Sequence, residues 1–150
     1  MRKNILNTVI LFLVMCIGLF SLCSCGGETE IVGKTAYIEI QVDNSEQTGE
    51  LSYTEPLEIR DDQAIEDLRK IVNSAEKYTE DEFLDFESCP IVTFYLVGGH
   101  KLALVASDYK GIFYISVNPP YFSDKTLYIL DDGFELASHI QNLYEKNLDK

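Results

Sequence analysis

Few side chains in this 150-residue chain have the types and spacing that hydrolytic catalysis requires. A hydrolytic triad needs a serine or cysteine nucleophile, a base and an orienting acid. The only two histidines, His100 and His139, do not have the spacing of metal ligands. Cys89 precedes Pro90 with no base near it in sequence, so we interpret it as a small buried residue. We expect no catalytic residues, metal or cofactor, and the alternative is a hydrolase that uses carboxylates.

An acidic stretch could hold a hard cation. Its acids are Glu80, Asp81, Glu82, Asp85 and Glu87. Calcium takes six to eight oxygens, supplied from alternating positions around a tight turn that usually contains glycine. Apolar residues interrupt these acids, and the chain has no Asp-x-Asp-x-Asp-Gly pattern. The stretch is therefore interpreted as a solvated loop whose apolar residues turn inward.

The segment Asn118-Pro119-Pro120-Tyr121 is similar to the four-residue signature of adenine-type amino-methyltransferases. That resemblance implies an S-adenosylmethionine site, which needs a glycine-rich loop on a doubly wound sheet, and the chain has neither. Because proline fixes φ and removes an N–H, two prolines after a strand predict a rigid turn instead.

Three aromatic residues near this turn are the candidate ligand-binding residues. They are Tyr109, Tyr121 and Phe122. Aromatic rings give a large contact area at low entropic cost, which suits the recognition of carbohydrate or peptide. The alternative is that Phe122 folds onto the core while Tyr121 lies on the surface.

The elements that must position these residues are predicted from hydrophobic periodicity. Alternating or continuous apolar runs predict strands at residues 35–42, 91–97, 101–107, 112–117 and 126–130, with an extended segment at 51–59. Apolar residues at helical spacing predict one helix from Asp61 or Asp62 to about residue 75. A second helix is predicted from Asp131 or Asp132 to Leu148, with Phe134 on its apolar side.

The turn at Gly98-Gly99-His100 predicts a hairpin. A three-residue loop at 98–100 pairs Leu96 with Leu102, and it continues the pairing with Phe94 opposite Leu104 and Val92 opposite Ala106. The order of elements predicts an α+β domain, in which an antiparallel β-meander sheet has two helices packed on one face.

The N-terminus has the pattern of an export signal. Arg2 and Lys3 precede a nearly continuous apolar run from residue 5 to residue 22. Leu22-Cys23-Ser24-Cys25 resembles the lipobox of bacterial lipoproteins, with an aliphatic residue at −3 and a small residue at −1. The resemblance implies lipidation of Cys25 and removal of residues 1–24. The two acyl chains of the lipid would give stable anchoring. The alternative is that residues 5–22 stay uncleaved as a membrane helix.

We therefore expect a signal peptide at 1–24, a lipidated Cys25 with a tether at 25–34, and a single domain at 35–150. The domain resembles the small lipoproteins of Gram-positive bacteria, through the helix start at Ile59-Arg60-Asp61 and the turn between Leu96 and Leu104. That likeness implies no activity. The expected location is the extracytoplasmic face of the cell membrane, with Cys25 holding the anchor.

The charge of the mature chain restricts its partners. Residues 1–24 contain two basic residues and no acid, so the remainder has 10 basic and 25 acidic side chains and a net charge of −15. This excess argues against nucleic acid and favours a cationic peptide, a protein or another cell-envelope component. The expected function is non-catalytic binding, and the alternative is an inhibitor or immunity-type protein with a basic partner. The sequence does not fix the oligomeric state.

Overall fold

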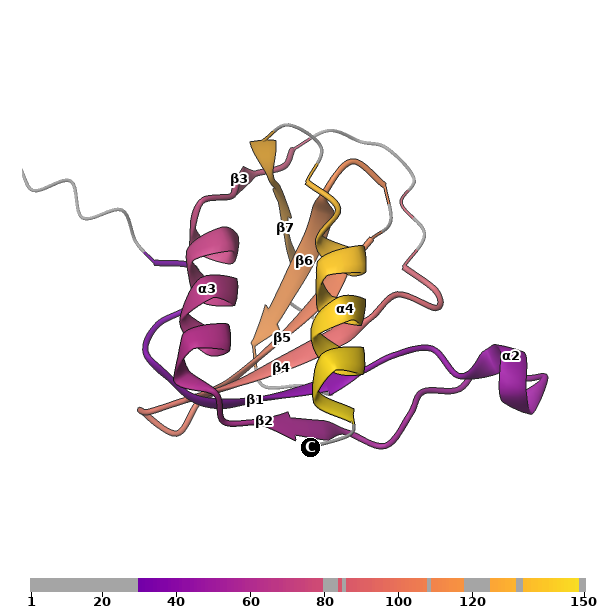
Figure 1. Ribbon diagram of the computed structural model, residues 1–150. Coiled ribbons are helices and arrows are strands. Elements are labelled where there is room, and N and C mark those ends of the chain that lie inside the picture. The colour runs from indigo at the N-terminus through magenta and orange to yellow at the C-terminus, as the bar shows by residue number, and fades with distance from the viewer. Residues whose placement is uncertain are drawn as a thin grey trace, which may run out of the picture. The chain divides into compact units, whose positions relative to one another are not determined.

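The structure is a computed structural model, and it describes residues 30–79, 84, 86–107, 109–117, 125–131 and 134–148. Residues from Ile31 onward form a compact unit (Figure 1). Its elements are β1 (Thr35–Gln41), α2 (Ser45–Thr48), β2 (Leu57–Ile59), α3 (Asp62–Asn73), β3 (Glu76–Lys77), β4 (Ile91–Leu96), β5 (Lys101–Ala106), β6 (Ile112–Val117), β7 (Lys125–Ile129) and α4 (Leu136–Leu148). This arrangement confirms the predicted α+β class.

Within the described residues, the strands form one seven-stranded sheet in the order β2-β1-β4-β5-β6-β7-β3. Every pair of neighbouring strands is antiparallel. Strands β4 to β7 are consecutive neighbours, which is the predicted meander. Strand β1 lies between β2 and β4, and the short strands β2 and β3 form the two edges.

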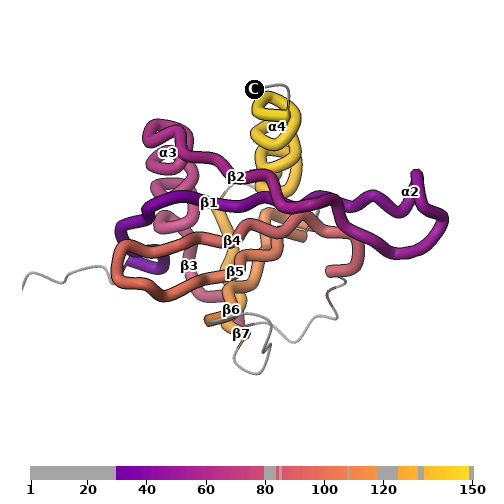
Figure 2. The backbone as a smooth tube through the Cα atoms, turned by 90° about the horizontal axis from the view of Figure 1, so that it is seen from below, coloured from indigo at the N-terminus to yellow at the C-terminus, as the bar shows by residue number. Residues whose placement is uncertain are grey.

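The main core lies between the sheet and the two longer helices, which are on the same side of the sheet in Figure 2. Alternating strand residues supply one half of it, including the fully buried Ile38, Phe94 and Leu104. Leu68 of α3 and Ile140 of α4 supply the other half. Alternation along the strands and a 3.6-residue period along the helices therefore converge on one apolar layer.

Helix α3 begins as the sequence predicts. The carboxylate of Asp61 accepts hydrogen bonds from the backbone N–H groups of Gln63 and Ala64, at 3.0 and 3.1 Å. These bonds satisfy donors that have no partner inside the helix. The predicted apolar stripe faces the sheet, with Ile65, Leu68 and Val72 buried.

The hairpin between β4 and β5 has a different register from the predicted one. Phe94 pairs with Leu102, and Val92 pairs with Leu104. The loop is 97–99 rather than 98–100, because Gly99 takes a left-handed conformation with φ +84° and Leu96 bonds to the carbonyl of His100. The observed pairing differs from the predicted one by two residues, which keeps the same side chains on the core face. The predicted partners were therefore wrong, but the side chains predicted to face the core were right.

Several element boundaries also differ from the prediction. Helix α4 begins at Leu136, and Phe134 precedes it instead of lying on its apolar side. The extended segment at 51–59 contributes only the three residues of β2. Helix α2 and strand β3 were not predicted. They have four and two residues, which is about one period of a helix or strand, so no periodicity marks them.

The segment before β1 is held against α3. Val32 is fully buried, its N–H donates to Asn73 Oδ1 at 2.8 Å, and its carbonyl accepts from Asn73 Nδ2 at 3.0 Å. Arg69 also donates to the Val32 carbonyl, at 3.4 Å from Nε. We call this arrangement the Val32 clamp. It packs the end of the predicted 25–34 tether onto the domain.

Candidate functional site

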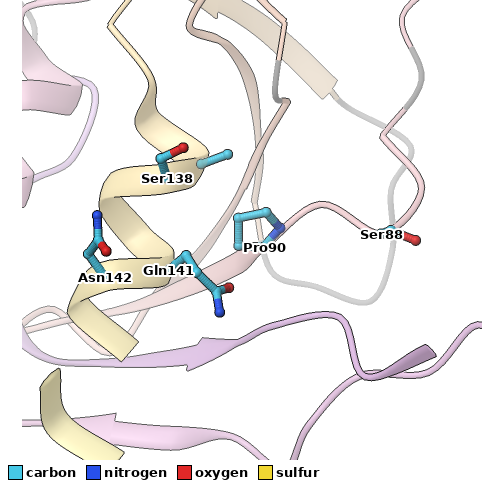
Figure 3. Close-up of a pocket in the computed structure, with 6 residues that line it drawn as sticks. Ser88, Pro90, Ser138, Gln141 and Asn142 are labelled. Atoms are coloured by element: carbon cyan, nitrogen blue, oxygen red, sulfur yellow. The ribbon is translucent and has the colours of Figure 1, made fainter. Parts of the chain in front are cut away.

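An open pocket of about 470 Å³ lies between α4 and the segment that leads into β4 (Figure 3). Its volume falls within the usual range for sites that bind small molecules. The described residues that line it are Ser88, Pro90, Ala137, Ser138, Gln141 and Asn142. The polar side chains among them carry hydroxyl or carboxamide groups.

Helix α4 presents polar residues to the pocket because its apolar residues pack against the sheet. Leu136, Ala137 and Ile140 are buried against the core, so positions 138, 141 and 142 fall on the adjacent side of the helix. Gln141 Nε2 donates to Glu145 Oε1 at 3.0 Å, one turn further along. This bond restricts the Gln141 side chain at the pocket wall.

The opposite wall contains a residue with an uncommon backbone conformation. Ser88 has φ +61°, a region that non-glycine residues rarely adopt. Such conformations cluster at functional sites, where the surrounding structure maintains them. Figure 3 shows the Ser88 hydroxyl directed away from α4. Ser88 contributes to the lowered pKa of Asp43, which indicates that the Asp43 carboxylate, in the connection between β1 and β2, lies near this pocket wall.

The connection between β1 and β2 is strongly acidic. Residues 43–56 contain Asp43, Glu46, Glu50 and Glu55 and no lysine or arginine. Hydrogen bonds from the side chain and backbone of Ser45, at 2.6 and 2.9 Å, lower the pKa of Asp43. The Asp43 carboxyl group therefore stays ionised at a lower pH than an ordinary aspartate does. We call residues 43–56 together with Glu87 the acidic end, since Glu87 adjoins Ser88 at the pocket wall.

A second cluster lies on the side of the sheet opposite α3 and α4. The rings of Tyr37 and Tyr95 stack at 4.2 Å, with Arg60 4.7 Å above the first ring and Lys101 4.5 Å above the second. The Tyr95 hydroxyl donates to Glu39 at 2.5 Å. That bond raises the pKa of Tyr95, with burial and the charge of Glu39 adding to it. Each ring therefore has a cation over it, and the contacts between cation and ring add to the attraction within the stack.

The structure describes one of the three predicted ligand-binding residues. Tyr109 lies in the turn between β5 and β6, is 46% exposed, and has the Lys110 ammonium 4.6 Å above its ring. Tyr121 and Phe122 lie outside the described residues, as do the lipidation site Cys25 and residues 118–120. The aromatic patch therefore stays a prediction.

Cys89 has a structural role, and the cation-binding candidates are described only in part. Cys89 is buried and packs with Val105 and Tyr114, which agrees with its interpretation as a small core residue. Among the residues with described positions, no group of three or more His, Cys, Asp or Glu side chains could hold a metal ion. Glu80, Asp81, Glu82 and Asp85 of the acidic stretch fall outside that part of the chain.

The pocket residues escaped the sequence analysis for a physical reason. Polar residues at 138, 141 and 142 indicate only the solvent-facing side of a helix. Nothing local shows that residues 88–90, about fifty positions earlier, pack beside that side. The one available signal was the Ser-Cys-Pro sequence before a strand, which indicates an ordered turn rather than a binding wall.

Hydroxyl and carboxamide groups do not titrate near neutral pH, so this lining suits recognition by hydrogen bonds. No helix in the part of the chain that the structure describes is long and apolar enough to cross a membrane. No family model, curated protein or solved structure matches this chain.

Proposed function

We propose that this chain is a membrane-anchored extracytoplasmic lipoprotein whose folded domain is a non-catalytic binding module. The lipobox Leu22-Cys23-Ser24-Cys25 supports the anchor. The start of the compact unit at Ile31 agrees with this, because it leaves only a short segment after Cys25. Such a segment would hold the domain near the membrane and raise its effective concentration for partners in the envelope.

The observation that carries the binding role is the polar pocket beside the acidic end. Its lining offers uncharged donors and acceptors, and Asp43 and Glu87 lie next to its Ser88 wall. Ligand pockets use a few such polar groups to fix orientation, and a nearby negative field attracts cations. The ligand class that fits is a polar group carrying positive charge, as on a basic peptide segment.

The anchor is tested by fractionation of cells that express the full chain. Cys25→Ser should move the protein out of the membrane fraction or leave it with its signal peptide attached and no lipid. The matched control is Cys23→Ser, which should keep both the membrane location and lipid incorporation. A Cys25→Ser chain that still incorporates lipid would overturn the proposal.

The binding role is tested with purified residues 26–150, which include the whole compact unit. Ser138→Trp places a large side chain at the exposed rim of the pocket, and Lys70→Trp adds the same group to an exposed position of α3 as control. Capture of a basic protein from cell envelopes, read by mass spectrometry, should be lost only with Ser138→Trp. Equal capture by both variants, or none by the unchanged domain at low salt, would contradict the proposal.

The acidic end favours a second candidate, the inhibitor or immunity-type protein. In that case one basic protein covers residues 43–56, and the pocket contributes little. The affinity would fall steeply with salt, and Glu46→Gln with Glu50→Gln would weaken binding more than Ser138→Trp. The opposite ranking would favour the pocket.

A further inference from the structure

Four cations lie at one end of the strands. Thr35 pairs with Leu96, and Tyr95 pairs with Lys101, so the start of β1, the end of β4 and the start of β5 lie side by side. Ser116 pairs with Lys125, which brings the end of β6 and the start of β7 to the same end. Arg60 follows Ile59, which pairs with Ile38 of β1, so the cations placed there are Lys34, Arg60, Lys101 and Lys125.

Two exposed valines lie among these cations. Val97 is 61% exposed in the turn between β4 and β5, and Val117 is 53% exposed at the end of β6. The N–H of Val97 donates to the carbonyl of Lys34 at 3.0 Å, so this turn adjoins the segment that enters β1. We call this surface the tether-side edge. It comprises Lys34, Arg60, Val97, Lys101, Val117 and Lys125.

The Val32 clamp fixes where the domain meets the preceding segment. Only seven residues, 25–31, separate the clamp from the membrane if Cys25 is lipidated, and a fully extended chain of that length spans about 25 Å. A domain of about 120 residues has a diameter of roughly 35 Å. The segment can therefore bring the neighbouring edge to a membrane surface more readily than the far end.

The charges along the strands differ between the two ends. Figures 1 and 2 both place α2, in the acidic end, opposite the turn between β4 and β5. Acids also lie near the tether-side edge: Glu58 pairs with Arg60 at 2.5 Å, Glu39 accepts from Tyr95, and Asp61 caps α3. Glu58 offsets the charge of Arg60, so the attraction to an anionic surface depends on Lys34, Lys101 and Lys125. An anionic surface would attract the cationic edge and repel the acidic end.

We propose that the tether-side edge rests on the anionic headgroups of the membrane that holds Cys25, which turns the acidic end and its pocket outward. This inference rests on the proposed lipid anchor. Lysines and arginines near an anionic leaflet add favourable electrostatic energy, and exposed apolar side chains bury themselves in the interface. The edge offers both groups beside the point where the chain enters the domain.

The test uses the absence of tryptophan from the chain. Val97→Trp and Leu51→Trp each introduce one tryptophan at an exposed apolar position, the second on the acidic end where Leu51 is 58% exposed. Residues 25–150 are coupled through Cys25 to a maleimide lipid in vesicles of phosphatidylglycerol and phosphatidylcholine that contain a brominated quencher lipid. A Cys25→Ser sample shows that the buried Cys89 does not couple.

Quenching at position 97 should exceed quenching at position 51 at least threefold. Lys34→Gln with Lys101→Gln and Lys125→Gln should reduce it at least twofold, as should vesicles of phosphatidylcholine alone. Equal quenching at both positions, or no loss on removing the three charges, would overturn the orientation. Because the lipid is attached chemically, this result is independent of the cellular Cys25→Ser test, and either proposal can fail alone.

Discussion

The Val32 clamp should contribute measurably to stability. Asn73→Ala removes both hydrogen bonds to the backbone of the fully buried Val32, at 2.8 and 3.0 Å. The Val32 carbonyl keeps its contact with Arg69, but the N–H loses its acceptor. A buried donor left unsatisfied costs about 1–3 kcal/mol, so we expect a loss of about 2 kcal/mol in the free energy of unfolding.

Urea denaturation of residues 26–150, followed by circular dichroism, measures this loss. With a slope of about 2 kcal/mol per molar, the midpoint should fall by about 1 M. The melting temperature should fall by roughly 6–10 °C. Asn142→Ala, at an exposed position of α4, is the matched control and should change stability by less than about 0.5 kcal/mol.

Asn73→Asp separates the two bonds of the clamp. A carboxylate still accepts from the Val32 N–H, but it faces the Val32 carbonyl with an acceptor where the amide supplied a donor. Asn73→Asp should therefore still destabilise the domain, through loss of the bond to the Val32 carbonyl. If Asn73→Ala stays within about 0.5 kcal/mol of the unchanged domain, water replaces the amide at no cost, and the reasoning from buried hydrogen bonds is refuted.

Two further changes test other parts of the fold. The Glu39 carboxylate raises the pKa of Tyr95 above its unfolded value near 10, so their bond stabilises the domain below pH 10 and is lost as pH rises further. Tyr95→Phe should cost about 1 kcal/mol at pH 8 and should flatten the loss of stability above pH 10 in urea titrations; an unchanged alkaline slope would contradict this. Gly111→Ala should cost more than about 2 kcal/mol, because φ is +66° and the added Cβ would lie 2.6 Å from the Phe134 carbonyl oxygen. Gly98→Ala meets only an ordinary contact and should be nearly neutral in the same melts, so equal effects of the two alanines would refute the steric argument.

Local sequence patterns predicted most of the strands and helices. Alternation identified β1 and β4 to β7, and the acid at position 61 with the stripe that follows identified α3. The hairpin register was also within reach, because a glycine as the last residue of a three-residue loop places the closing pair at Leu96 and His100. The error came from counting the loop from Gly98 instead of from Val97.

Contacts between residues far apart in the chain could not be predicted from the sequence. Strand β3 has two residues and pairs with β7, about fifty positions later, so nothing in its own composition marks it. The stack of Tyr37 on Tyr95 follows only once β1 is known to lie beside β4. The pocket likewise depends on where α4 lies against residues 88–90. Each of these features arises from the order of strands, which periodicity does not encode.

The two edge strands of the sheet determine whether copies of the domain on one membrane can pair edge to edge. Edge strand β2 has three residues directly after Pro56, and β3 has only the charged pair Glu76 and Lys77. Long apolar edges act as templates for the next chain, and short charged edges do not. On the membrane to which we propose it is anchored, the domain could therefore reach high lateral density without recruiting its neighbours into a continuous β-ribbon.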